Sequence, residues 1–278
     1  MSADSPLRRV LKSLLAPILN ETTYSHIQAV AKARDIANAS WTEPEIDLCN
    51  LVLRDGDTAV DIGANFGLWS YHMSRAVGRS GKVYAFEPVP FTATTFGKVA
   101  RRLGFAHNVD LHEAGCGEKA GEIEFTLPVS ESGAIISGLV HMRRDDARPG
   151  KEEHLPYGKT RTIRCPVVRL DDELAEAERI SLLKCDIEGA DLFAMRGAKA
   201  LLERHKPVVV IEVDSWYLQG FGLTVKDLTD FFGGLGYRSY RYDGSSLAPT
   251  GTTEDDENNW VFVHPANSER LAAIMPSR

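Results

Sequence analysis

The stretch TAVDIGANFG at residues 58–67 constrains the fold of this chain more than any other segment. Its first half is β-branched and apolar and ends on Asp61, which predicts a short buried strand. A glycine-rich turn follows at once, and apolar residues then recur at the three- to four-residue spacing of a helix. Gly63 and Gly67 let the main chain approach a bound molecule closely, and amides at the start of a helix face such a molecule. We therefore predict a ligand site at this turn.

The order of the acid and the glycines in this turn indicates which class of ligand the turn can bind. A dinucleotide-binding turn reads G-x-G-x-x-G, whereas here the spacing is G-x-x-x-G and Asp61 stands before the first glycine. A carboxylate at that point repels a pyrophosphate but suits a ligand with an ammonium group, such as S-adenosylmethionine (SAM). A Walker A loop is excluded because no Gly-Lys-Ser/Thr follows. The alternative is an ordinary tight turn between a strand and a helix.

Composition narrows the partners and the compartment. The net charge of −7 and the pI near 5.7 argue against a broad nucleic-acid surface, which needs clustered Lys and Arg. No secretory signal is evident, and no apolar run approaches the roughly 20 residues of a membrane span. The four cysteines show no CxxC pairing, so we predict reduced thiols and a cytoplasmic protein.

The first part of the chain has a different texture from the rest. Residues 1–54 have helical patterns and no glycine, which predicts an N-terminal helical cap before a domain at 55–278. Residues 6–19 carry an apolar helical face with basic residues beside it. That face suits peripheral contact with a membrane surface, packing on the chain's own domain, or contact with a second copy in a homo-oligomer.

Strand and helix patterns alternate from residue 55 onward. Such alternation implies right-handed βαβ units and a parallel sheet. An irregular, polar insertion at 128–162 interrupts the pattern, and we predict that residues 138–159 form a mobile lid over the substrate. The predicted strands lie at 58–62, 82–86, 109–112, 180–185 and 208–211, with a closing hairpin at 237–242 and 260–264. Residues 121–127 and 162–168 also alternate like strands, and helices are expected after the second strand, ending at Gly104, and at 191–204.

Acidic side chains follow most of these strands. Ligands of open α/β sheets bind beyond the carboxyl ends of the strands, so these acids are expected on one rim. A carboxylate after the second strand, here Glu87, is suited to accept hydrogen bonds from the two ribose hydroxyls of an adenosine. The acids after the strands are Asp61, Glu87, Asp186, Glu188, Glu212 and Asp214.

Four motifs in order carry a family resemblance: VDIGANFG at 60–67, VYAFEP at 83–88, LKCDIEG at 183–189 and PVVVIE at 207–212. Together with NWVFV at 259–263 they resemble the FkbM family of SAM-dependent methyltransferases. The resemblance implies an α/β, Rossmann-like class I methyltransferase fold. Its sheet would have seven mostly parallel strands with the last antiparallel, and helices on both faces.

The resemblance also implies a function and a set of site residues. It implies methyl transfer from SAM to a hydroxyl oxygen of a small molecule, a sugar, or a glycan or natural-product acceptor. This chain has Glu113 where family members often have Asn, in the segment expected to contact adenine. The cofactor-binding residues carried over by position are Asp61, Gly63, Asn65, Gly67, Glu87, Pro88, Cys116, Gly117 and Glu118.

Methyl transfer to an alcohol needs a base or a metal, because an alcohol is a poor nucleophile at neutral pH. Lys184, Asp186 and Glu188 alternate at one strand end and would share a face if the strand continued that far. We predict Asp186 or Glu188 as the base, with Lys184 orienting it; a structural ion pair is the alternative. A second mechanism would use Mg²⁺ held by Asp186, Glu212 and Asp214.

Two other functions stay open from the sequence. A nicotinamide-dependent oxidoreductase would share the sheet, although its turn glycines would be spaced differently. A non-catalytic SAM-binding protein is the other, although a cluster of like charges is costly without a function.

Overall fold

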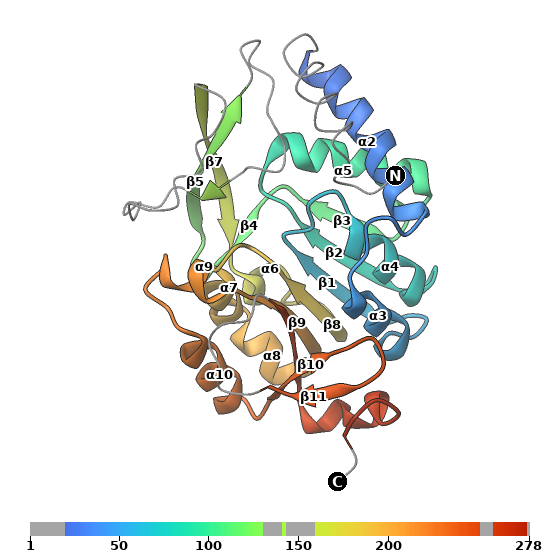
Figure 1. Ribbon diagram of the computed structural model, residues 1–278, viewed down its shortest axis with the longest axis vertical. Coiled ribbons are helices and arrows are strands. Elements are labelled where there is room, and N and C mark those ends of the chain that lie inside the picture. The colour runs from blue at the N-terminus through green and yellow to red at the C-terminus, as the bar shows by residue number, and fades with distance from the viewer. Residues whose placement is uncertain (1–19, 130–140, 143–158, 251–257, 277–278) are drawn as a thin grey trace.

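An eight-stranded sheet forms the centre of the computed structural model, which describes residues 20–129, 141–142, 159–250 and 258–276 (Figure 1). The spatial order is β11-β10-β12-β9-β8-β1-β2-β3. The parallel strands are β1 (Thr58–Ile62), β2 (Lys82–Phe86), β3 (Val109–His112), β8 (Ile180–Cys185) and β9 (Val208–Val213). The strands paired antiparallel at one edge are β10 (Arg238–Tyr242), β11 (Leu247–Pro249) and β12 (Asn258–Val263). The predicted mostly parallel sheet is confirmed.

The short strand β11 adds one strand to the seven that were expected. It exists because the chain reverses directly after β10, where the Asp243 carboxylate accepts hydrogen bonds from the main-chain amides of Ser245 and Ser246. The reversal places β11 beside β10 at the sheet edge. The rest of the closing hairpin, β10 with β12, forms as predicted.

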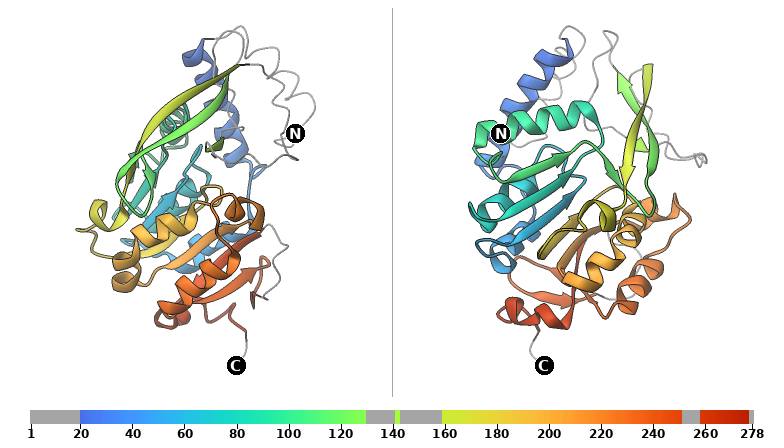
Figure 2. Two further views of the ribbon diagram at one scale, coloured as in Figure 1. Left: turned by 90° about the vertical axis from the view of Figure 1, so that its left-hand side faces the viewer. Right: turned by 180° about the vertical axis from the view of Figure 1, so that it is seen from behind.

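Helices cover both faces of the sheet (Figure 2). Alternate residues of each central strand enter different cores, because successive side chains of a strand point to opposite faces. In β1, Ala59 joins the core under the helices between residues 21 and 103, whereas Val60 joins the core under the helices between residues 191 and 234. The two central strands β8 and β9 are apolar along almost their whole length because both of their faces are buried. Helices on both faces were predicted and are confirmed.

The helices follow the strands in βαβ order. Their ends carry the expected signals: α5 begins at Pro90 and ends before Gly104, and Thr224 and Asp227 form a capping box at the start of α10. The bounds are α4 (Leu68–Val77), α5 (Pro90–Leu103), α6 (Leu170–Glu173), α7 (Asp191–Gly197), α8 (Lys199–His205), α9 (Ser215–Gln219), α10 (Val225–Gly234) and η2 (Pro265–Leu271).

One predicted helix is divided in two. The apolar spacing over 191–204 predicts a single helix, but the structure has α7 and α8 with Ala198 between them. Gly197, the last residue of α7, lies against Gly117, where a Cβ would come within 2.0 Å of the Gly117 carbonyl oxygen. This close contact is tertiary and leaves no trace in the local apolar pattern.

The described N-terminal part, residues 20–54, is helical as expected. It contains α2 (Glu21–Ala37), η1 (Pro44–Ile46) and α3 (Asp47–Val52). Helix α2 packs on α5, with the rings of Tyr24 and Phe91 stacked 5.7 Å apart. Leu48 and Val52 of α3 are fully buried in the core on the α4 side of the sheet. The division between a cap and a domain at residue 55 stays a prediction, and residues 6–19 lie outside the described residues.

A second sheet stands beside the main one (Figure 1). Its order is β4-β7-β5-β6, and most of it is the long antiparallel pair β5–β7. Its strands are β4 (Gly115–Cys116), β5 (Gly121–Val129), β6 (His141–Met142) and β7 (Lys159–Val168). The alternating patterns at 121–127 and 162–168 correctly predicted β5 and β7, while most of the expected lid at 138–159 lies outside the described residues.

Two further observations concern the helices and the cysteines. Within the described ranges, none of the helices combines the length and the apolar content that membrane crossing requires. All four cysteines are buried free thiols.

Candidate active site

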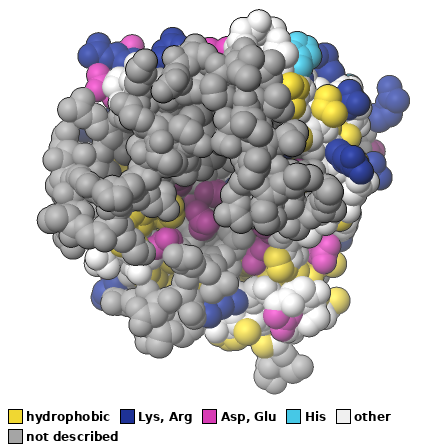
Figure 3. Space-filling view, turned by 45° about the horizontal axis from the view of Figure 1, so that its top comes forward, with side chains coloured by type: hydrophobic (Ala, Val, Ile, Leu, Met, Phe, Trp, Pro, Cys, Tyr) yellow, Lys and Arg dark blue, Asp and Glu magenta, His cyan; other side chains and the backbone are white. Residues whose placement is uncertain are grey.

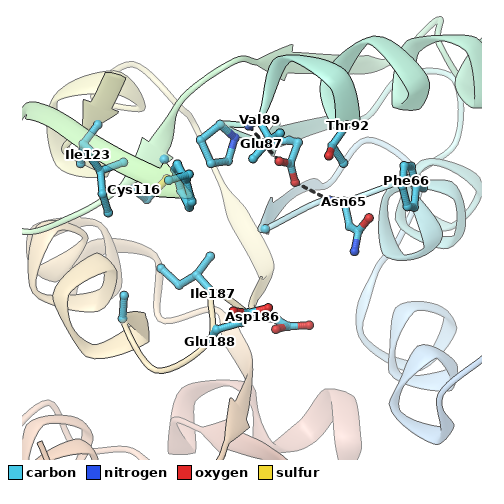
Figure 4. Close-up of a pocket in the computed structure, with 16 residues that line it drawn as sticks. Asn65, Phe66, Glu87, Val89, Thr92, Cys116, Ile123, Asp186, Ile187 and Glu188 are labelled. Carbon is cyan, nitrogen blue, oxygen red and sulfur yellow. Dashed lines mark hydrogen bonds between the residues drawn. The ribbon is translucent and has the colours of Figure 1, made fainter. Parts of the chain in front are cut away.

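The carboxylate of Glu87 stands at the end of β2, and its direction is set by the main chain. Oε2 accepts a hydrogen bond from the amide of Asn65 at 3.0 Å, and Oε1 accepts one from the amide of Val89 at 3.0 Å. The side chain is buried but lines a cavity (Figure 4). Burial raises the pKa of Glu87 to about 7, against the two amide hydrogen bonds that lower it. The Glu87 carboxylate is therefore a partly desolvated hydrogen-bond acceptor in a fixed orientation, with lone pairs left for a ligand.

The glycine turn after β1 forms another part of the cavity. Gly63 has φ +74°, and a Cβ there would lie 2.0 Å from the carbonyl oxygen of Asp186. Only glycine fits this position, because both its backbone angle and its surroundings exclude a side chain. Asn65 also has a positive φ, at +48°, and it lines the cavity. The turn therefore packs directly against the residues that follow β8, which brings two of the predicted motifs together.

The cavity has a volume of about 280 Å³ and two chemically different ends. In Figure 4, Ile123 and Cys116 lie at one side, and Asp186 and Glu188 lie below Glu87. Acidic side chains are seen at the bottom of a hollow in the space-filling view (Figure 3). The residues of the apolar wall are Pro88, Cys116, Ile123, Phe125 and Val167. The cavity therefore suits an elongated ligand with an apolar ring at one end and a cation at the other.

Lys184 and Asp186 form an ion pair at the floor of the site. The Lys184 ammonium lies 2.8 Å from Oδ2 of Asp186. Burial lowers the pKa of Lys184, but Asp186, Asp61 and Glu43 together outweigh burial and raise it. For Asp186, burial raises the pKa, but the Lys184 ammonium outweighs it and holds the pKa below its usual value. Both groups are therefore charged at neutral pH.

Asp61 supports this pair from behind the cavity. Its side chain is fully buried, and Oδ2 accepts a hydrogen bond from the Ser70 hydroxyl at 2.5 Å. Burial raises the pKa of Asp61, and the Lys184 ammonium opposes that rise. Oδ1 finds no hydrogen-bond partner among the described residues. The carboxylate thus shares Lys184 with Asp186 and keeps one unused acceptor atom.

Glu212 is the neighbour of Asp186 on the next strand. Cys185 pairs with Ile211 in the β8–β9 register, so the residues that follow them lie side by side. Burial raises the pKa of Glu212 to about 8, and the charge of Asp186 and a hydrogen bond with Asp186 add to the rise. At neutral pH, Glu212 is therefore the protonated partner and Asp186 the ionised one.

Glu188 does not continue the strand as the alternation had suggested. The strand β8 ends at Cys185, and Glu188 has a left-handed backbone with φ +54°. Asp191 holds this turn by accepting hydrogen bonds from the amides of Ile187 at 3.3 Å and Gly189 at 3.1 Å. The condition for one shared face, a strand that continues through Glu188, is therefore not met, although the side chains of Lys184 and Asp186 do pair. Glu188 nevertheless lines the cavity from the turn.

The predicted site residues divide into two groups. The predicted residues that line the cavity are Gly63, Asn65, Glu87, Pro88, Cys116, Asp186 and Glu188. The predicted residues outside this lining are Asp61, Gly67, Gly117, Glu118 and Lys184. Among these, Glu118 lies 3.8 Å from Arg196 in an ion pair, and Gly67 is the N-cap of α4. The cofactor-binding roles of Asp61, Gly67, Gly117 and Glu118 and the orienting role of Lys184 stay predictions.

Sequence reasoning missed several lining residues. Ile123, Phe125 and Val167 come from β5 and β7, whose alternation was recognised but not used. Because every second residue of a strand shares a face, that alternation could have selected them. Phe66, Val89, Thr92, Ile187 and Ala190 also line the cavity.

The metal alternative finds less support in the geometry. Oδ1 of Asp214 accepts hydrogen bonds from the amides of Trp216 at 2.7 Å and Tyr217 at 3.3 Å, which caps α9. Asp186 and Glu212 are already engaged with each other and with Lys184. In the described part of the chain, no group of three or more His, Cys, Asp or Glu side chains is arranged to hold a metal ion.

The strand order and the position of the cavity define the class of protein. The sheet order reverses between β1 and β8, and the cavity lies at the carboxyl ends of these strands and of β2. This is the arrangement of a Rossmann-like class I methyltransferase. The model of the methyltransferase FkbM domain matches residues 61–239. The chain belongs to the FkbM methyltransferase family.

Individual relatives agree with the family. Methyltransferase 1 of Beauveria bassiana (strain ARSEF 2860) is 30% identical over 150 residues, which cover 51% of this chain and 59% of that protein. Methyltransferase sdnD of Sordaria araneosa is 26% identical over 237 residues, which cover 77% of this chain and 87% of that protein. The crystal structure of methyltransferase FkbM from Methylobacillus flagellatus KT is similar with a TM-score of 0.47 and 19% identity, over 82% of this chain and 52% of that one. The match thus spans less than two thirds of the Beauveria and Methylobacillus proteins.

Proposed function

We propose that this protein transfers a methyl group from SAM to a hydroxyl oxygen of a small molecule, a sugar, or a glycan or natural-product acceptor. The observation that carries the proposal is that two carboxylates line the same cavity. Glu87 accepts hydrogen bonds from two main-chain amides, and Asp186 forms an ion pair with Lys184. Membership of the FkbM methyltransferase family supports it.

The residues of the cavity fit SAM. Glu87 is placed to accept hydrogen bonds from ribose hydroxyls, and the wall of Ile123, Phe125 and Val167 suits an adenine ring. The turn at Gly63 and Asn65 suits the methionine part of SAM. Asp61 lies behind this end of the site, and its Oδ1 has no hydrogen-bond partner among the described residues.

When bound, SAM supplies a methyl carbon on a sulfonium that needs no activation by the protein. The chain must therefore align the acceptor and remove its hydroxyl proton. Asp186 is ionised at neutral pH and lines the cavity, so we assign it as the base that takes this proton. A base of low pKa is sufficient, because the hydroxyl becomes strongly acidic as its oxygen bonds to the methyl carbon.

Lys184 and Glu212 hold Asp186 in place for this step. Lys184 binds Oδ2 of Asp186, and protonated Glu212 shares a hydrogen bond with the same carboxylate. Two partners on two strands limit the rotation of the Asp186 side chain. In this assignment Glu188 faces the acceptor from the turn.

Calorimetric titration with S-adenosylhomocysteine tests the cofactor, with NADH as the comparison ligand. Saturable binding of S-adenosylhomocysteine and none of NADH is expected; the reverse pattern would replace the proposal with the oxidoreductase. The reaction is tested with methyl-labelled SAM and a panel of monosaccharides, glycolipids and hydroxylated polyketides, with EDTA present in parallel. Label in a base-stable ether product supports O-methylation, and an equal yield with EDTA present supports a mechanism without a metal. Label found only in amines or esters would overturn the assignment of the acceptor atom.

A further inference from the structure

The segment before η1 reaches the catalytic end of the sheet from outside the matched region 61–239. Oε2 of Glu43 accepts a hydrogen bond from the indole N–H of Trp69 at 2.9 Å. The side-chain amide of Asn259 also donates to Oε2 of Glu43 at 3.3 Å, and to Oε2 of Glu45 at 3.2 Å. Glu43 is therefore fixed by one donor from α4 and one from β12.

Both donors belong to the surroundings of the catalytic pair. The ring of Trp69 faces Lys184, with the ammonium 6.0 Å from the ring centroid. Asn259 lies opposite Glu212 in the β9–β12 register. A polar network thus runs from the N-terminal segment to the residues that hold Asp186.

The charge of Glu43 acts on Lys184. The carboxylates that favour the charged form of Lys184 are Asp186, Asp61 and Glu43, which come from the end of β8, from β1 and from the N-terminal segment. Glu45 shares Asn259 with Glu43 but is not among these charges. The Lys184 ammonium thus lies in the field of carboxylates from three elements, one of which, that of Asp186, is in contact with it.

We propose that Glu43 is a positioning residue for Lys184, so that the N-terminal segment completes the catalytic end of the site. The inference rests on the proposed function only for the role of Asp186. What it states physically is that Glu43 restrains the buried ammonium group of Lys184. Glu43 itself is not among the residues that line the cavity, and in this assignment it does not touch the reacting atoms.

The test observes Lys184 directly by ¹⁵N nuclear magnetic resonance of lysine side chains in the full chain, with S-adenosylhomocysteine present and absent. The Lys184→Arg variant assigns the signal. In Glu43→Gln, which keeps an acceptor for Trp69 but removes the charge, we expect Lys184 hydrogen exchange to become about tenfold faster, equivalent to about one pKa unit. Glu43→Asp should restore most of the protection.

Glu45→Gln is the matched control. It also replaces a carboxylate that accepts a hydrogen bond from Asn259, but the charge of Glu45 is not among those that act on Lys184. Equal exchange rates in Glu43→Gln and wild type, or equal acceleration in both Gln variants, would overturn the proposal. So would the lack of a protected Lys184 signal in the wild type. Binding of S-adenosylhomocysteine, measured on the same samples, tests the proposed function separately, so failure of one is distinguishable from failure of the other.

Discussion

Lys184 and Asp186 lie 2.8 Å apart at the edge between protein interior and cavity, with 4% of the Lys184 side chain and 34% of the Asp186 side chain exposed. The ammonium is thus a buried partner, and the carboxylate is the one that a substrate can reach. The pair has a structural role and, in the proposed function, a chemical one, and variants can separate the two.

Removing the buried cation should destabilise the fold. Lys184→Met leaves Asp61 and Asp186 without their shared counter-charge, so we expect the free energy of unfolding to fall by about 3–5 kcal/mol in urea titrations. Lys82→Met is the control, because Lys82 pairs with Asp110 at 3.1 Å with both side chains about half exposed. That surface pair should contribute only about 0–1 kcal/mol. Similar losses in both variants would show that Lys184 is not a buried counter-charge.

Removing the proposed base should lower turnover and leave the affinity for the cofactor unchanged. For Asp186→Asn we expect kcat to fall by about 10²–10⁴-fold with any hydroxyl acceptor that the wild type methylates, because general-base assistance contributes that much. Affinity for S-adenosylhomocysteine should stay near that of the wild type. Glu188→Gln should cost less, since Glu188 lies on the turn beyond β8. Near-normal kcat in Asp186→Asn would move the role of base to Glu188 or Glu212.

Cofactor affinity should depend on pH through Glu87. Burial raises its pKa from 4.5 to about 7, so the empty site binds a proton more tightly than an unfolded chain does. Its contribution to stability is therefore greatest below pH 4.5 and is lost as the pH rises toward 7. The affinity for the ligand should have the opposite pH dependence, because in the proposed site the ribose hydroxyls donate hydrogen bonds to the ionised carboxylate of Glu87.

We therefore expect the dissociation constant of S-adenosylhomocysteine to rise by about tenfold for each pH unit below the pKa of Glu87. Calorimetry across this range measures it. Glu87→Gln should bind weakly at every pH, since an amide cannot accept from both Asn65 and Val89 while facing the ribose. Glu212→Gln should keep the wild-type midpoint; a midpoint that moves with Glu212 instead would contradict the assignment to Glu87.

Gly63 offers a test of the turn. Gly63→Ala would place a Cβ 2.0 Å from the Asp186 carbonyl oxygen at φ +74°, so we expect loss of S-adenosylhomocysteine binding and a lower thermal midpoint. Gly104→Ala is the control, because Gly104 has φ +76° and open space around its Cβ position. It should show only the strain of the left-handed backbone, about 1–2 kcal/mol. Normal binding by a folded Gly63→Ala protein would place the cofactor elsewhere.

Local sequence determined much of the architecture. The apolar runs of β8 and β9, the helix spacing of α4 and α5, and the alternation of β5 and β7 each depend on neighbouring residues, and each was correctly predicted. The acids at the strand ends were also found from the sequence, because parallel strands bring their carboxyl ends to one edge. Asp186 and Glu87 were among them.

Tertiary structure decided what each acid does. Asp61 lies within β1, whereas Glu87 directly follows β2. Asp61 is buried behind the cavity, where the Ser70 hydroxyl donates to it, while Glu87 lines the cavity and accepts hydrogen bonds from two main-chain amides. Asp186 is ionised and Glu212 protonated because Lys184 lies nearer to the first, which no spacing along the chain shows. The link from Glu43 to Trp69 and Asn259 joins residues far apart in sequence. Burial and through-space charge depend on the whole fold, so they follow only from the assembled structure.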